Sequence, residues 1–201
     1  MVSAGYRVIY LTGAPAAGKS SVTQGLARLV APLEVFEYGE RLTRYLASRQ
    51  DQALTQEVLR QRSAGVAGPE DVRAVDRLLL DFVTEARTRA HVVVDSHAVT
   101  RERYGFRVTP YSLGDFALLS ADAICVLFTP PDVAVERIDR SPAGRPRVTL
   151  WESGFHTGLQ ASVATTYGMS IGVPIYLIDS SPPIDDVVSE VARLFKTGSA
   201  K

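Results

Sequence analysis

Residues 7–20 read RVIYLTGAPAAGKS, and this stretch decides the fold of the 201-residue chain. Its first part, residues 7–12, is an apolar run rich in β-branched residues, which predicts a strand buried on both faces. Gly13 and Gly18 then allow tight backbone turns, and a helical pattern occupies residues 20–30. The sequence therefore predicts a buried strand, a glycine-containing loop and a helix in direct succession.

The loop matches the phosphate-binding pattern G-x-x-x-x-G-K-[ST] at every fixed position. In such a loop, backbone N–H groups surround phosphate oxygens, the lysine contacts the β- and γ-phosphates, and the hydroxyl ligates Mg²⁺. Lys19 is the only lysine in the first 195 residues, although the chain has 22 lysines and arginines. We therefore expect ATP and Mg²⁺ as cofactors, with Ser20 as a metal ligand. The predicted cofactor-binding residues are Gly13, Ala14, Pro15, Ala16, Ala17, Gly18, Lys19, Ser20 and Ser21.

Strand-like and helical segments alternate along the rest of the chain. Further buried strands are predicted at residues 91–95, 123–128 and 174–178, with a weaker candidate at 33–36. Helical patterns occupy residues 40–63 (broken near 50–51), 69–89, 131–140, 152–170 and 184–195. This alternation predicts right-handed crossovers and an α/β three-layer sandwich, in which helices flank a five-stranded parallel sheet.

The composition excludes several classes of protein. A chain with 46% hydrophobic and 22% charged residues has an ordinary globular composition, and its length suits a single domain over residues 1–201. Zero net charge argues against duplex nucleic acid as a partner. One cysteine, Cys125, allows no internal disulfide, and we find no signal peptide or membrane span in the sequence. We therefore expect a cytoplasmic protein without a membrane partner.

Asp95 ends the predicted strand 91–95. Ligands of parallel α/β sheets bind outside the carboxyl ends of the strands, where the phosphate-binding loop also lies, so Asp95 is a candidate catalytic residue and Mg²⁺ ligand. A structural alternative is that Asp95 caps the following turn. His97 either contacts the acceptor or orients Asp95, or it has only a structural role.

Arginines cluster in two further regions. Arg145 and Arg147 lie in a Pro/Gly-containing segment, and we predict that they form a catalytic lid at about residues 140–150. Arg140 is four residues from Glu136, which favours a simple ion pair. Arg107 follows the Asp95 segment, and Arg41 lies in a helical region at about residues 38–65 that we expect to bind the acceptor.

These motifs together resemble the archaeal-type adenylate kinases, a branch of the P-loop nucleoside monophosphate kinases. The similarity rests on the phosphate-binding loop, on Tyr38-Gly39-Glu40, on Asp95-Ser96-His97-Ala98 and on Gly144-Arg145-Pro146-Arg147. It implies that Lys19, Asp95, Arg145 and Arg147 are catalytic and that the acceptor is AMP, and it is compatible with a homo-oligomer. The substrate-binding residues that we predict are Tyr38, Gly39, Glu40, Arg41, His97 and Arg107.

Three functional hypotheses remain open from the sequence. The first is transfer of the ATP γ-phosphoryl group to a nucleoside monophosphate, with AMP as the leading candidate. The second is transfer to a hydroxyl of a nucleoside or another small metabolite, which would require a carboxylate such as Asp95 or Glu40 as a base. The third is a nucleotide-binding module without turnover. The segment Gly105–Tyr111 differs from the family's proline- and glycine-rich loop near the acceptor, so the sequence leaves the acceptor open.

Overall fold

The computed structural model describes residues 5–50, 55, 67–140 and 146–196. Its centre is a five-stranded sheet in the order β2-β3-β1-β6-β7, and every neighbouring pair is parallel. The strands are β1 (Val8–Gly13), β2 (Leu33–Glu37), β3 (His91–Asp95), β6 (Ala123–Phe128) and β7 (Ile175–Asp179). The predicted fold class is therefore confirmed.

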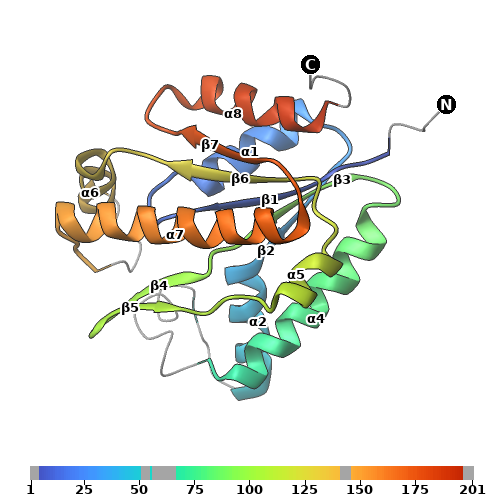
Figure 1. Ribbon diagram of the computed structural model, residues 1–201, viewed down its shortest axis with the longest axis horizontal. Helices are drawn as coiled ribbons and strands as arrows, with labels where there is room; N and C mark the ends of the chain where they lie inside the picture. Colours follow the sequence, from blue (N-terminus) through green and yellow to red (C-terminus); the bar gives the residue numbers. More distant parts are fainter. Residues whose placement is uncertain (1–4, 51–54, 56–66, 141–145, 197–201) are drawn as a thin grey trace.

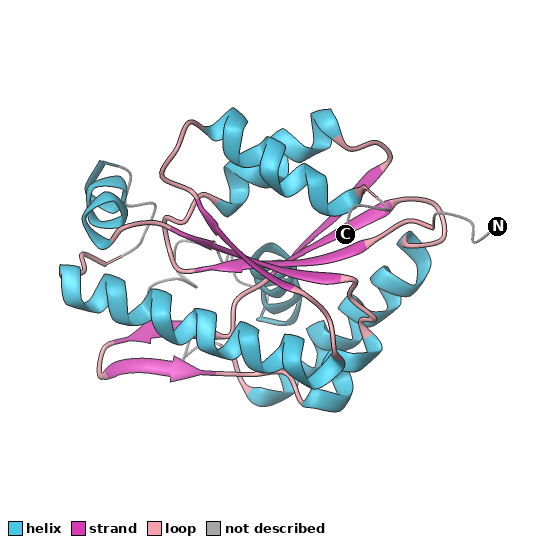
Figure 2. Ribbon diagram, turned by 45° about the horizontal axis from the view of Figure 1, so that its top comes forward, coloured by secondary structure: helices cyan, strands magenta, loops and turns pink. Residues whose placement is uncertain are grey.

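Helices connect the strands and cover both faces of the sheet (Figures 1 and 2). They are α1 (Lys19–Leu29), α2 (Tyr38–Gln50), α4 (Pro69–Ala86), α5 (Leu113–Leu118), α6 (Pro131–Arg140), α7 (Leu150–Ile171) and α8 (Ile184–Ala192), followed by the 3₁₀ turn η1 (Arg193–Phe195). The predicted helix 40–63 is seen as α2 up to residue 50, and its remainder lies outside the described residues except for Thr55. None of the helices in the described part of the chain is both long and apolar enough to cross a membrane.

The alternating side chains of β1 divide the core into two halves. Ile9 and Leu11 face α1 and α8, whereas Val8 and Tyr10 face α4, α5 and α7. All four are fully buried, as the apolar run predicts. Cys125 belongs to the α1–α8 side of the core, in agreement with its position in an apolar strand.

A second, two-stranded sheet is the main element that the sequence pattern missed. The antiparallel strands β4 (Val99–Glu102) and β5 (Gly105–Val108) form a hairpin that lies apart from the central sheet, next to the start of α7 (Figure 1). The hairpin is short and polar, and its segment contains three arginines, so it lacks the apolar run by which the other strands were recognised.

Candidate active site

The P-loop (Gly13–Ser20) has the backbone shape that its two glycines predict. A Cβ on Gly13, whose φ is 155°, would lie 2.5 Å from the Leu127 carbonyl oxygen, so a side chain cannot fit there. Gly18 has a left-handed φ of 83° and precedes α1 directly. The Lys19 ammonium donates a hydrogen bond of 3.2 Å to the Gly13 carbonyl and lies 3.9 Å from Asp95 Oδ1. The loop is therefore folded around its lysine, which points toward the end of β3.

Arg137 of α6 supports the P-loop from outside the pocket. Its guanidinium donates hydrogen bonds to the carbonyl oxygens of Ala16 (3.2 Å) and Ser180 (2.8 Å). Ala16 has a left-handed φ of 64°, a conformation that costs an alanine free energy and must be held by its surroundings. Arg137 thus fixes the strained part of the loop to the segment that follows β7.

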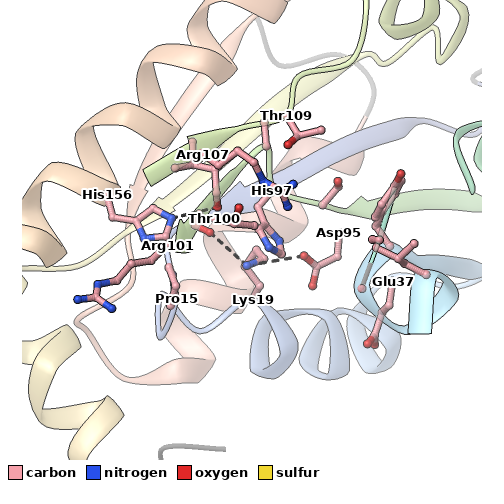
Figure 3. Close-up of a pocket in the computed structure, with 18 of the residues that line it drawn as sticks. Pro15, Lys19, Glu37, Asp95, His97, Thr100, Arg101, Arg107, Thr109 and His156 are labelled. Carbon is pink, nitrogen blue, oxygen red and sulfur yellow. Dashed lines mark hydrogen bonds and ion pairs between the residues drawn. The ribbon is translucent and has the colours of Figure 1, made fainter. Parts of the chain in front are cut away.

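A cavity of about 290 Å³ opens beside the P-loop at the carboxyl ends of β1, β2 and β3. Figure 3 shows Lys19 and Asp95 on its floor, with Glu37 on one side and His156, Arg101 and Arg107 on the other. The hairpin, α2, α4 and α7 all contribute to its walls. The cavity lies where α/β sheets bind ligands. The chain goes from β1 to β2 on one side of the sheet and later to β6 on the other side of β1, and ligands bind at the strand ends where the direction of the connections reverses in this way.

Two carboxylates lie side by side at the ends of neighbouring strands in this cavity. Glu37 and Asp95 are the last residues of β2 and β3 and are partners in the strand register. Burial raises the pKa of Asp95, and the nearby Lys19 ammonium partly opposes this shift. Burial also raises the pKa of Glu37, with further contributions from Asp95 and Glu40. Lys19 therefore favours the charged form of Asp95, whereas the two charged groups that act on Glu37, Asp95 and Glu40, favour its protonated form.

The hairpin side of the cavity is held in place by one face of α7. Gln160 Oε1 accepts a hydrogen bond from the Val99 amide (3.1 Å), and His156 Nε2 lies 3.1 Å from the Val99 carbonyl oxygen. Desolvation lowers the pKa of His156 to about 4. The ring is therefore neutral at pH 7, and its Nε2–H donates to the carbonyl. Gln160 Nε2 also donates to Thr12 Oγ1 (2.9 Å), so this residue links the hairpin to β1.

Two arginines of the hairpin line the cavity, and each has a carboxylate partner. Arg101 pairs with Glu152 of α7 at 2.6 Å. Arg107 pairs with the buried Glu102 at 3.3 Å, and its Nε is buried without a hydrogen-bond partner among the described residues. The positive charges of both arginines are thus largely balanced by carboxylates that do not themselves line the cavity.

On the opposite side, α2 and α4 meet at a tyrosine–aspartate contact. The Tyr38 hydroxyl donates a 2.8 Å hydrogen bond to Asp76 Oδ1. Burial raises the pKa of Asp76. Leu42, Val72 and Tyr111 line the same part of the cavity, so this wall combines an apolar surface with one carboxylate.

The structure brings together many of the residues predicted from sequence. The predicted residues that line the cavity are Gly13, Pro15, Lys19, Ser20, Tyr38, Gly39, Glu40, Asp95, His97 and Arg107. The predicted residues that are in the described structure but do not line it are Ala14, Ala16, Ala17, Gly18, Ser21, Arg41 and Arg147.

Arg41 and Arg147 lie elsewhere for identifiable reasons. The Arg41 guanidinium stacks over the rings of Phe36 and Phe82, at 5.3 and 5.7 Å from their centroids. Arg147 has a 93% exposed side chain, 3.6 Å from Asp139, although its neighbours Pro146 and Val148 line the cavity. Arg145 lies outside the described residues.

Glu37, Asp76 and His156 are cavity residues that the sequence reasoning did not select. Glu37 could have been found, because it directly follows the weak strand candidate 33–36, and strand ends carry the site in this architecture. Asp76 and His156 lie within helices, and their sequence neighbours give no signal of a pocket. Trp151, near the start of α7, is 69% exposed and stacks on Phe155.

The residues beside Lys19 suit a magnesium–nucleotide complex. The Ser20 hydroxyl and the Asp95 carboxylate both line the cavity and offer the hard oxygen atoms that Mg²⁺ prefers. Among the described residues there is no group of three His, Cys, Asp or Glu side chains placed to hold a metal. Mg²⁺ commonly takes its remaining ligands from water and substrate phosphates, so two protein ligands are sufficient.

Comparison with known proteins agrees with this geometry. The chain resembles the structure of a sugar kinase from Janibacter sp. HTCC2649, with a TM-score of 0.52, 13% identity and 94% of each chain covered. It also resembles shikimate kinase from Acinetobacter baumannii in complex with shikimate, with a TM-score of 0.56 and 17% identity over 98% of this chain and 96% of the other. At these identities the likeness shows the fold alone. No curated protein matches the chain in sequence. The family model AAA_17, described as an AAA domain, matches residues 12–153, and the chain therefore belongs to this P-loop kinase family.

Proposed function

We propose that the chain transfers the γ-phosphoryl group of ATP to a hydroxyl group of a small molecule. The observation that carries this proposal is the pair of carboxylates Glu37 and Asp95, which are register partners at the ends of β2 and β3, with Asp95 3.9 Å from the Lys19 ammonium. A hydroxyl acceptor must lose a proton as it attacks phosphorus, whereas a phosphate acceptor is already ionised. Two carboxylates with different environments allow one to hold the metal and the other to take the proton.

The two carboxylates divide these roles according to their neighbours. Asp95 lies 3.9 Å from the Lys19 ammonium and, with Ser20, would hold the Mg²⁺ that neutralises phosphate charge. Glu37 would accept the hydroxyl proton while the acceptor oxygen bonds to the γ-phosphorus and the bond to the β–γ bridging oxygen breaks, releasing ADP. Glu40, the other base considered from sequence, already accepts a hydrogen bond from Arg44. Glu37 is therefore the better candidate for the base.

The two kinases compared above are consistent with this proposal, because sugars and shikimate both carry hydroxyl groups. Transfer to AMP or another nucleoside monophosphate is a second candidate. It is supported by Arg107, whose guanidinium lines the cavity together with Tyr38, Gly39 and Glu40. One panel of acceptors separates the two candidates, and a protein that only binds nucleotide would form no ADP with any of them.

Glu37→Gln tests the role of the base. With a hydroxyl acceptor we expect kcat to fall by about 10²- to 10⁴-fold and the KM for ATP to stay within about twofold. In the parent protein, kcat/KM should rise with pH through the raised pKa of Glu37 and then level off, because the base must be deprotonated. This rise of kcat/KM with pH should be absent from Glu37→Gln.

Glu34→Gln is the matched control, since Glu34 lies on the same strand but pairs with Arg89 outside the cavity. It should leave kcat unchanged. An unchanged kcat in Glu37→Gln, or ADP formation with nucleoside monophosphates alone, would contradict the proposal.

A further inference from the structure

The acidic groups of the cavity are less well compensated than its basic groups. Lys19 faces Asp95, while Arg101 and Arg107 face Glu152 and Glu102. In contrast, none of the ion pairs formed by the described residues includes Glu37 or Asp76. Both of these carboxylates line the cavity. Apart from the electrostatic contribution of Arg77 at Asp76, the charge left without an ion-pair partner on the acceptor side is therefore negative.

Asp76 is placed to recognise a group on the acceptor. Its Oδ1 accepts the Tyr38 hydroxyl at 2.8 Å, which fixes the carboxylate at the junction of α2 and α4. No hydrogen bond to its second oxygen is found among the described residues. An ionised carboxylate accepts several hydrogen bonds, so Asp76 retains capacity for a donor from the ligand.

The surroundings of Asp76 define the shape of that ligand. Leu42, Val72 and Tyr111 line the same wall, and the rings of Tyr38 and Tyr111 lie edge to face with their centroids 6.1 Å apart. Such a wall favours the C–H face of a small carbon skeleton. A second carboxylate or phosphate here would face Glu37 and Asp76 at the cost of like-charge repulsion.

From this charge balance we infer that Asp76 is a specificity residue that binds an O–H or N–H donor on an uncharged or cationic acceptor, a polyhydroxylated or amino-hydroxylated compound. This inference rests on the proposed hydroxyl kinase activity. Glu37 would serve the reacting hydroxyl, and Asp76 would bind a second donor group of the same molecule. An ammonium and a hydroxyl share the donor chemistry that Asp76 requires, and the experiment below separates them.

The test measures ADP formation from ATP·Mg²⁺ with three groups of acceptors. These are neutral polyols (glucose, myo-inositol), amino sugars (glucosamine, kanosamine) and anionic compounds (gluconate, shikimate, AMP). We expect the highest kcat/KM in the first two groups. If the amino sugars exceed their hydroxyl counterparts by about 10-fold or more, the donor is an ammonium; similar values identify a hydroxyl.

Asp76→Asn then tests the residue itself. It should lower kcat/KM for the best acceptor by about 10- to 100-fold, because a hydrogen bond to a charged group is lost. The loss should disappear with a deoxy analogue of that acceptor, which lacks the O–H or N–H group that Asp76 binds. The KM for ATP should not change. Asp81→Asn removes an exposed carboxylate from the same helix and should have no effect on either parameter.

The possible failures are distinguishable. A preference for gluconate or shikimate, or an unchanged kcat/KM in Asp76→Asn, overturns this inference and leaves hydroxyl phosphorylation intact. Turnover of AMP alone overturns the proposed function and this inference with it. Absence of ADP formation with every acceptor also overturns both the proposed function and this inference.

Discussion

Gln160 is a single buried side chain on which the positions of the P-loop strand and the hairpin both depend. It is 1% exposed, and it bonds the Val99 amide and Thr12 Oγ1, both of which belong to fully buried residues. Gln160→Leu keeps most of the volume but leaves these two polar groups without partners. A buried group that loses its partner costs about 1–3 kcal/mol. Taking about 2 kcal/mol for the amide and about 1 kcal/mol for the hydroxyl, we expect a loss of about 3 kcal/mol in the free energy of unfolding.

Urea and thermal unfolding would measure this loss. For a chain of this size, about 3 kcal/mol corresponds to a decrease in Tm of about 6–12 °C, and the urea m-value should be unchanged. Thr12→Val combined with Gln160→Leu supplies the control, because it removes the Thr12 hydroxyl that has lost its hydrogen-bond partner. The double variant should recover about 1 kcal/mol relative to Gln160→Leu alone. The reasoning is refuted if Gln160→Leu unfolds within about 0.5 kcal/mol of the parent protein or if the double variant shows no recovery.

Two further predictions concern the same helix and the lid. The pKa of His156 is lowered to about 4, so the unfolded chain binds a proton below its ordinary pKa of 6.5 that the native state does not bind. Stability should therefore be complete above pH 6.5 and fall by about 2 kcal/mol between pH 6.5 and pH 5, measured by urea unfolding; His156→Gln should lack this component, and an equal slope in both proteins would show that His156 is not its source. Arg147→Ala should lower kcat by at least about 100-fold with little change in the KM for ATP if the predicted lid acts on the transferring phosphoryl group. Arg140→Ala, which removes an exposed arginine paired with Glu136, should leave kcat unchanged, and equal kcat values for the two variants would leave Arg147 without a catalytic role.

The central sheet could be predicted from sequence because its strands are buried on both faces. Residues 8–11 and 123–128 carry continuous apolar runs, and burial of every residue in β1 is the physical cause of that pattern in the first of them. The P-loop was predictable for a related reason, since its backbone conformation requires glycine at residues 13 and 18. In these elements the sequence pattern and the structural requirement coincide.

The hairpin and the acceptor side of the cavity were less predictable because long-range contacts hold them. Residues 99 and 160 are far apart in the chain, yet the hydrogen bonds of Gln160 and His156 fix the start of β4. Asp76 lines the cavity because α4 packs against α2, and no local sequence motif indicates that packing. Glu37 could have been selected as the last residue of a strand, because strand ends carry the site in this architecture, but the predicted strand ended one residue too early.

One face of α7 aligns the donor and acceptor halves of the site. Glu152, His156 and Gln160 follow one another at four-residue intervals, so they share a single stripe of the helix. The first contacts Arg101, the second contacts Val99, and the third contacts both Val99 and Thr12. A one-residue insertion within this stripe would rotate the residues after it by about 100° and separate the hairpin from the P-loop strand. Substitutions elsewhere on the hairpin leave the stripe intact, so this architecture can exchange one acceptor for another while its nucleotide machinery keeps its geometry.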